Sequence, residues 1–135
     1  MIPCVRSIPV GWTFNHLNAR NGWAEFVFDS DREGYSALIV SLRPSCSIDE
    51  ASQIASDQPG TERYERINRV TNGFGGERIY TFDGGCVVYT FDLHGESRAE
   101  PVTEISNALG FVTRPDLADQ VSEHSDGRLS LDPTE

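Results

Sequence analysis

The sequence predicts an α+β domain, in which an antiparallel sheet of five to seven strands carries two C-terminal helices packed on one face and a short helix after Cys46. Runs of aromatic and β-branched residues recur over residues 8–91, and turn-forming residues separate them, which predicts the strands. Beyond residue 97 the apolar residues instead recur at helical spacing, which predicts the two C-terminal helices.

Three apolar runs predict the strands of the N-terminal part. The first spans residues 8–14, and the asparagines that follow it predict a turn. The next two, residues 23–28 and 36–42, flank a polar connector, so we expect them to pair as an antiparallel hairpin. Pro44 ends the third run, because proline has no amide to donate to a sheet.

A short helix is predicted after Cys46. Ser47 and Glu50 have the spacing of a capping box, in which each side chain accepts a hydrogen bond from a free amide of the first turn. Apolar residues then fall at helical spacing, at Ile48, Ala51, Ile54 and Ala55. Pro59 and Gly60 end this helix.

Three further strands are predicted in the middle of the chain. Residues 62–70 alternate charged and less polar side chains, which indicates a half-exposed strand. Residues 78–82 and 86–91 form the clearest hairpin pattern, because the aspartate and two glycines at 83–85 between them tolerate positive φ.

The C-terminal part predicts two helices. The first covers residues 97–109 and ends at Gly110. The second begins with Thr113 as its cap and ends at Gly127. The apolar faces of the two helices comprise Val102, Ile105, Ala108 and Leu109 in the first, and Leu117 and Val121 in the second.

The chain is predicted to form one domain over residues 1–135, because it contains no repeat and no linker. Leu129 and Leu131 alternate with polar residues and predict a short final strand. The ends, residues 1–6 and 132–135, are expected to be frayed. The expected core comprises Trp23, Phe26, Phe28, Leu38, Val40, Ile79, Val87, Tyr89, Phe91, Val102, Ile105, Leu109, Leu117 and Val121.

The charge and hydrophobicity of the chain exclude some classes of binding partner. The chain has 135 residues and a formal net charge of −10, from 21 acidic and 11 basic side chains. Such a surface repels phosphate backbones, so nucleic acid is not an expected partner. No run approaches the roughly 20 apolar residues that span a bilayer, and residues 1–6 lack the apolar core of a signal peptide. Membrane attachment is therefore expected only through a segment absent from this chain.

Cys46 and Cys86 each follow a turn and border a predicted strand, and neither belongs to a C-x-x-C motif. In a small acidic domain this pattern favours a disulfide, and two buried thiols or two zinc ligands are the alternatives. A zinc site would need His16, His94 or Cys4 to converge on the pair. A disulfide indicates an extracytoplasmic location, whereas a cytoplasmic protein would hold three free thiols. The role of Cys4 stays open.

A set of short motifs lies in the chain from Pro44 onward. They are Pro44–Cys46, Asp57–Arg66, Gly84–Phe91, Ala108–Arg114 and Gly127–Pro133. Through them, about two thirds of the chain resembles an uncharacterised family of actinobacterial membrane proteins that have a short extracytoplasmic domain. The resemblance implies an extracytoplasmic location and a paired Cys46 and Cys86, and it assigns no catalytic residue. This chain differs from that family in containing no transmembrane segment.

One acidic loop is a candidate metal site. Asp29, Asp31 and Glu33 alternate and precede Gly34, as in the first half of a calcium-binding loop. The position that needs a bidentate glutamate holds Val40, so a polar hairpin turn is the alternative.

Three residues are candidate partner contacts. Phe74 lies in a glycine-rich loop, residues 72–76, that has no phosphate-binding lysine, and it belongs either to the core or to an exposed contact surface. Tyr64 and Arg66 share one face of a predicted strand, and these residue types are favoured at interfaces. The alternative for that strand is a solvated surface with cross-strand ion pairs.

These observations favour a non-enzymatic extracytoplasmic domain, cross-linked by Cys46 and Cys86, that binds a protein or a cell-envelope component and needs no cofactor. The alternative is a small hydrolase or metal-dependent enzyme using His16 or His94, although no motif with a nucleophile beside a base accompanies them. A third hypothesis is a cytoplasmic adaptor with reduced thiols. Convergence of the histidines with carboxylates in a cleft would favour the enzyme, and an exposed aromatic patch would favour binding.

Overall fold

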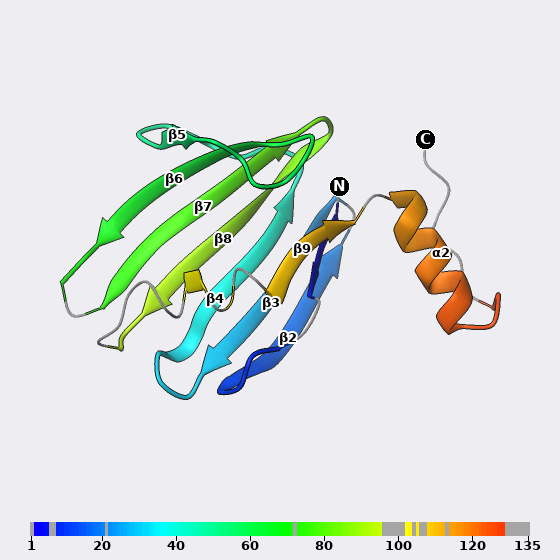
Figure 1. The fold of residues 1–135 in the computed structure, drawn as a ribbon, viewed down its shortest axis with the longest axis horizontal. Helices are drawn as coiled ribbons and strands as arrows, with labels where there is room; N and C mark the ends of the chain where they lie inside the picture. The colour runs from blue at the N-terminus through cyan, green and yellow to red at the C-terminus, as the bar shows by residue number, and fades with distance from the viewer. Residues whose placement is uncertain are drawn as a thin grey trace.

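The computed structural model describes residues 2–5, 8–20, 22–71, 73–95, 102, 103, 105, 108–112 and 114–128 (Figure 1). The strands with defined bounds are β1 (Ile2–Val5), β2 (Trp12–Arg20), β3 (Trp23–Ser30), β4 (Gly34–Arg43), β5 (Ser52–Ile54), β6 (Glu62–Arg69), β7 (Phe74–Phe82), β8 (Gly85–Leu93) and β9 (Leu109–Val112). The helix with defined bounds is α2 (Arg114–His124). No helix within the described ranges is long and apolar enough to cross a membrane.

Seven strands form one antiparallel sheet in the order β2-β3-β4-β8-β7-β6-β5, which confirms the prediction of five to seven strands. Both predicted hairpins are present, as β3 with β4 and as β7 with β8. Neighbours in this sheet also follow one another along the chain, except β4 and β8. Two runs of hairpins, β2 to β4 and β5 to β8, therefore meet where β4 pairs with β8.

β2 is longer than the sequence predicts. The expected strand at 8–14 ends in a turn, whereas β2 continues through the asparagines to Arg20. A register shift between Phe14 and His16 interrupts its pairing with β3. The side chain of Asn15 donates a hydrogen bond to Asp29 on β3 at 2.8 Å, so this asparagine supports the strand pairing rather than a turn.

One face of the large sheet carries the hydrophobic core, and we call it the core face. Leu38 on β4 lies opposite Phe91 on β8, and Val40 lies opposite Tyr89. All four side chains are at most 3% exposed. Nine residues of the predicted core are buried, namely Phe28, Leu38, Val40, Ile79, Val87, Tyr89, Phe91, Ile105 and Leu109.

A two-stranded antiparallel sheet of β1 and β9 lies on the core face (Figure 1). Phe111 of β9 packs edge-on against Tyr80, with ring centroids 5.1 Å apart. It also stacks on Tyr89 at a centroid distance of 6.4 Å and an interplanar angle of 6°. Aromatic contacts between the layers therefore hold β9 against the middle of the large sheet.

Two predictions about the terminal parts of the chain are wrong. Residues 1–6 are expected to be frayed, but Ile2–Val5 form β1, which pairs with β9. Gly110 is expected to end a helix, but it lies within β9, opposite Cys4. The helical spacing before Gly110 does not extend through β9, because these residues gain a strand partner from the other end of the chain.

The prediction of two C-terminal helices packed on one face is not borne out. Of the first, Val102, Thr103, Ile105 and Ala108 have helical backbone, and Leu109 already begins β9. α2 lies beyond the sheets rather than on a face (Figure 1), and its Leu117 and Val121 stay partly exposed. The sequence of α2 is mostly polar, so it lacks the wide apolar stripe that packing on a sheet requires. The predicted strand at 129–131 and the end at 132–135 lie outside the described residues.

The predicted helix after Cys46 is wrong. The hydroxyl of Ser47 does accept a hydrogen bond from the Asp49 amide at 3.4 Å, as a cap would, but Glu50 has a φ of 61° and the turn ends there. Ser52–Ile54 then form β5, which pairs with β6. Strand pairing outweighs a capping signal that is worth about 1 kcal/mol.

Cys46 and Cys86 form the predicted disulfide, with their Cα atoms 6.2 Å apart. Cys86 points to the face of the large sheet opposite the core face, which we call the back face. The chain after Cys46 lies over this face, where Arg66 donates hydrogen bonds to the carbonyl oxygens of Ser47 at 3.2 Å and Asp49 at 2.8 Å. The disulfide thus joins the sheet to a segment that lies over part of its back face.

Candidate functional site

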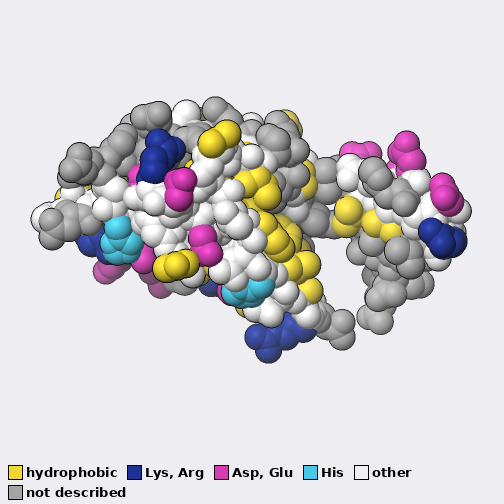
Figure 2. All heavy atoms as spheres, turned by 90° about the horizontal axis from the view of Figure 1, so that it is seen from below, with side chains coloured by type: hydrophobic (Ala, Val, Ile, Leu, Met, Phe, Trp, Pro, Cys, Tyr) yellow, Lys and Arg dark blue, Asp and Glu magenta, His cyan; other side chains and the backbone are white. Residues whose placement is uncertain are grey.

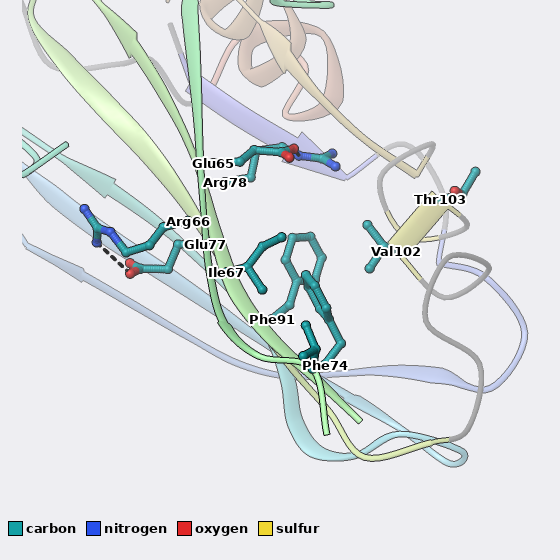
Figure 3. A pocket seen from close by; sticks show the side chains of 10 residues that line it. Glu65, Arg66, Ile67, Phe74, Glu77, Arg78, Phe91, Val102 and Thr103 are labelled. Atoms are coloured by element: carbon teal, nitrogen blue, oxygen red, sulfur yellow. Dashed lines mark hydrogen bonds and ion pairs between the residues drawn. The ribbon is translucent and has the colours of Figure 1, made fainter. Parts of the chain in front are cut away.

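An open groove of about 450 Å³ lies on the core face, between β6, β7 and β8 on one side and residues 102–103 on the other (Figure 3). Its apolar lining comes from Ile67, Val70, Phe74, Phe91 and Val102. Figure 3 shows the rings of Phe74 and Phe91 close together beside Ile67, with Val102 across the groove. Concave apolar surfaces of this kind are the usual sites for ligands and for side chains of partners.

The groove exists because β7 carries a glycine at its floor. Gly76 lies between Ile67 of β6 and Phe91 of β8, where another residue would place a side chain on the core face. A Cβ atom at this position would lie 2.7 Å from the carbonyl oxygen of Arg66 and 3.3 Å from the ring of Phe74. The glycine-rich segment predicted as a loop therefore begins a strand, and its lack of side chains makes room for the groove.

Charged side chains bound the groove at the end remote from Phe74. Glu65 accepts hydrogen bonds from Nε of Arg63 at 3.2 Å and from Nε of Arg78 at 2.9 Å. Figure 3 shows Glu65 and Arg78 directed toward one another. Burial raises the pKa of Glu65, but the hydrogen bonds from the two arginines outweigh it and hold the pKa of this carboxyl below its usual range. The groove therefore joins an apolar pocket to an ionised polar end.

A buried tyrosine, Tyr80, connects this polar end of the groove to the loop that precedes β6. The Tyr80 hydroxyl donates a hydrogen bond to Asp57 at 2.8 Å, and Arg63 lies 3.8 Å from the same carboxylate. Burial and the hydrogen bond to Asp57 raise the pKa of Tyr80 to about 12. The hydroxyl therefore stays protonated and tethers the loop before β6 to the sheet.

Replacing Glu65 with glutamine is expected to lower the free energy of unfolding by about 1.5–3 kcal/mol at neutral pH, the usual contribution of hydrogen bonds to a charged group. Because the folded-state pKa of Glu65 is lowered, its stabilisation is present above the unfolded-state pKa of about 4.3 and is lost as pH falls through the folded-state pKa. Urea denaturation across this pH range should show the difference from wild type shrinking as the solution becomes more acidic.

Glu62→Gln is the matched control for this measurement. Glu62 lies on the same strand, is exposed, and accepts a hydrogen bond from the Tyr64 hydroxyl at 3.0 Å. Its replacement should change the free energy of unfolding by no more than about 0.5 kcal/mol, as for most surface substitutions. A loss in Glu65→Gln that is the same at every pH would contradict the role assigned to the ionised carboxylate.

The three predicted partner contacts do not share one surface. Phe74 and Arg66 both border the groove, but the side chains of Tyr64 and Arg66 belong to the set of β6 residues that points to the back face. Arg66 forms an ion pair with Glu77 at 2.9 Å, and Figure 3 shows this pair turned away from the groove. Arg66 therefore has a structural role in holding the segment over the back face.

Of the three acidic residues of the candidate calcium loop, Asp29 and Asp31 border one open pocket, which Glu33 does not line. Asp29 accepts a hydrogen bond from the Ser36 amide at 2.7 Å, which lowers the pKa of this carboxyl. Glu33 is buried and accepts a hydrogen bond from the Gly95 amide at 2.5 Å, while Asp31 is exposed. In the described part of the chain, no group of three or more His, Cys, Asp or Glu side chains is placed to hold a metal ion.

His16 and His94 lie on different parts of the sheet. His16 is on β2, and its Nδ1 is 2.7 Å from the side-chain oxygen of Asn15. His94 follows β8, with Nε2 3.3 Å from Asp92, which also accepts a hydrogen bond from Arg69 at 3.0 Å. Figure 2 shows histidine side chains at two separate places on one face. None of these residues lines the groove. Among the described residues, the enzyme hypothesis is therefore supported by one exposed contact, between His94 and Asp92, that lies outside the groove.

Ile67 and Val70 line the groove, although no sequence motif marks either of them as a contact residue. Both belong to a stretch that alternates with charged residues and was expected to be half-exposed. The signal that could have found them is the pair Gly75–Gly76 between two β patterns, because glycine inside a strand marks a hollow or a close approach.

Comparison with known proteins finds no relative for this chain. No family model, no curated protein and no solved structure matches it. Its function therefore has to be argued from the groove, the disulfide and the surfaces of the sheet.

Proposed function

We propose that this chain is a non-enzymatic extracytoplasmic binding domain, and that its groove takes up an apolar part of a protein or of a cell-envelope component. The observation that carries the proposal is the groove of about 450 Å³ on the core face. Its lining surface is mainly apolar, and the Glu65–Arg78 ion pair bounds one end of it. A mainly apolar lining with a few polar groups is the usual construction of a ligand site.

Exposure at the mouth of the groove supports this function. Ile67 is 63% exposed and Val70 is 47% exposed, and both line the groove together with the partly buried Phe74. Large apolar side chains that rim a concave surface are typical of interaction sites, because water is released when a partner covers them.

The disulfide supports the proposed location. A bond between Cys46 and Cys86 is consistent with an oxidising compartment, where such bonds persist. We also propose that the chain from Pro44 onward is related to the actinobacterial extracytoplasmic domains that it resembles, a relationship that would imply the same location.

A neutral apolar dye tests the groove directly. We expect N-phenyl-1-naphthylamine to bind with saturable fluorescence, and Ile67→Asp to weaken that binding by about tenfold or more, because an ionised carboxylate beside the dye would have to be desolvated. Ile67 is largely exposed, so the substitution should leave the fold intact. Fluorescence titration of the oxidised full chain measures both dissociation constants.

Tyr35→Asp is the matched control for the dye. Tyr35 is 86% exposed and does not line the groove, so the dye should bind this variant as it binds wild type. Equal weakening by the two substitutions, or dye binding that does not saturate, would contradict the proposed function.

A further inference from the structure

The two edges of the large sheet differ in length. At one edge β5 has three residues, a length that protects a sheet from pairing with another chain. At the other edge β2 has nine residues, and eight of them, from Thr13 to Arg20, are exposed. No described strand of the same chain pairs with the outer side of β2. Its outward amides and carbonyls are therefore available to another strand.

Apolar side chains follow this edge. Figure 2 views the molecule from below, the side on which β2 lies in Figure 1, and shows a band of hydrophobic side chains there. Phe14 is 43% exposed and Leu17 is 51% exposed, and both point to the core face because they lie opposite Phe28 and Phe26 of β3. β2 contains no lysine and no proline, two of the features that prevent pairing at an edge, and its one irregularity is the register shift between Phe14 and His16.

The charges at the two ends of β2 are opposite. Arg20 ends the strand, and its guanidinium lies over the Trp23 ring at 4.5 Å. The carboxylate of Asp31 lies at the start of the strand, where a Cβ atom on Gly11 would be 2.6 Å from its Oδ1. No described residue forms an ion pair with either Arg20 or Asp31. An antiparallel partner of the same sequence would bring each of these charges next to its opposite.

We propose that β2 pairs with β2 of a second copy of this chain, antiparallel about a two-fold axis. In the register that places Phe14 opposite Leu17 of the second copy, Arg20 falls opposite Gly11 of that copy and so beside its Asp31. The exposed apolar side chains then meet on one face, and the two ion pairs form by symmetry. The two sheets become one continuous sheet. Because the axis is two-fold, both copies contribute the same surface, β2, to the interface.

The overall charge favours this edge over other surfaces. Each copy carries a net charge of −10, so most surfaces of two copies repel one another. β2 contains no acidic residue and carries one arginine. Two copies that meet along β2 therefore bring few carboxylates together.

Sedimentation equilibrium of the oxidised full chain in the Cys4→Ser background tests the proposal without interference from an intermolecular disulfide. We expect a reversible monomer–dimer equilibrium. Leu17→Asp should weaken it by about tenfold or more, because it places two like charges within the interface. Arg20→Glu alone and Asp31→Arg alone should each weaken it, and the double exchange Arg20→Glu with Asp31→Arg should restore the dissociation constant to within about threefold of the parent.

Each other outcome would overturn part or all of the proposal. A monomer at every accessible concentration would mean that a second copy does not occupy this edge, and a dimer unchanged by Leu17→Asp would place the interface elsewhere. A double exchange that fails to restore the dimer would exclude the antiparallel register. Ile67→Asp, in the groove near the opposite edge of the sheet, should leave the dimer unchanged, which separates this proposal from the binding function.

Discussion

The variant with serine at both Cys46 and Cys86 is expected to unfold with a free energy about 4 kcal/mol lower than that of the oxidised wild type. The two cysteines are 40 residues apart in the sequence, and the bond between them restricts the unfolded chain far more than the folded one. Because a domain of this size has a total stability of about 5–15 kcal/mol, the expected loss is a large fraction of it. Urea denaturation of both proteins measures the difference.

Cys4→Ser is the control for this loss. Cys4 is a free thiol, so its replacement should cost no more than about 0.5 kcal/mol if the pairing of β1 with β9 is kept. Intact mass after alkylation should show one labelled thiol in denatured, unreduced protein and three after reduction. Three labelled thiols without reduction would rule out the disulfide and remove the main support for an extracytoplasmic location.

Phe28→Ala should cost about 3–5 kcal/mol in the free energy of unfolding. Phe28 is fully buried on the core face, and its truncation leaves a cavity that the surrounding strands cannot close. Urea or thermal denaturation at low protein concentration measures this cost without a contribution from association.

Phe14→Ala is the matched control for Phe28→Ala. The two rings contact edge to face at 5.7 Å on neighbouring strands, but Phe14 is 43% exposed. Its truncation should cost no more than about 1.5 kcal/mol, the contribution of an aromatic pair beyond burial. Equal costs at the two positions would mean that β2 is packed as tightly as the middle of the sheet, and the proposed free edge would then be untenable.

The strands that could be predicted from the sequence are those whose partners are their neighbours. β3 with β4 and β7 with β8 combine alternating apolar residues with a short turn, and both signals lie within about 20 residues. The disulfide was predictable for a related reason, because Cys46 and Cys86 each border one of these strands. A local sequence pattern is sufficient to predict a strand pairing when the two strands are neighbours in the sequence.

The elements that were predicted wrongly depend on distant partners. Ser47 and Glu50 have a helical capping pattern, but the residues after them pair with β6 instead. Leu109 has helical spacing, but it begins a strand whose partner is β1, at the opposite end of the chain. A local pattern cannot report a competing contact that is distant in sequence, so tertiary pairing decides both segments.

The groove was predictable only in part. Phe74 was identified as a candidate contact, but its neighbours in the groove come from three strands and from residues near Val102. The hollow between them depends on Gly76, which lies opposite Ile67 and Phe91 across the sheet. A cavity that forms because one strand lacks a side chain becomes visible only when the strands on both sides are known.

The pairing of β4 with β8 also has a consequence for the rate of folding. Every other pairing in the large sheet joins consecutive strands, which keeps the contact order low and allows hairpins to form in microseconds. The join between the two runs of hairpins brings Arg43 opposite Cys86, far apart in the sequence. The disulfide lies beside this pair, so an oxidised chain starts its search with these strands already close together. In the oxidised protein, the disulfide shortens the loop that must close before β4 can pair with β8, so this pairing no longer requires a search between distant parts of the chain.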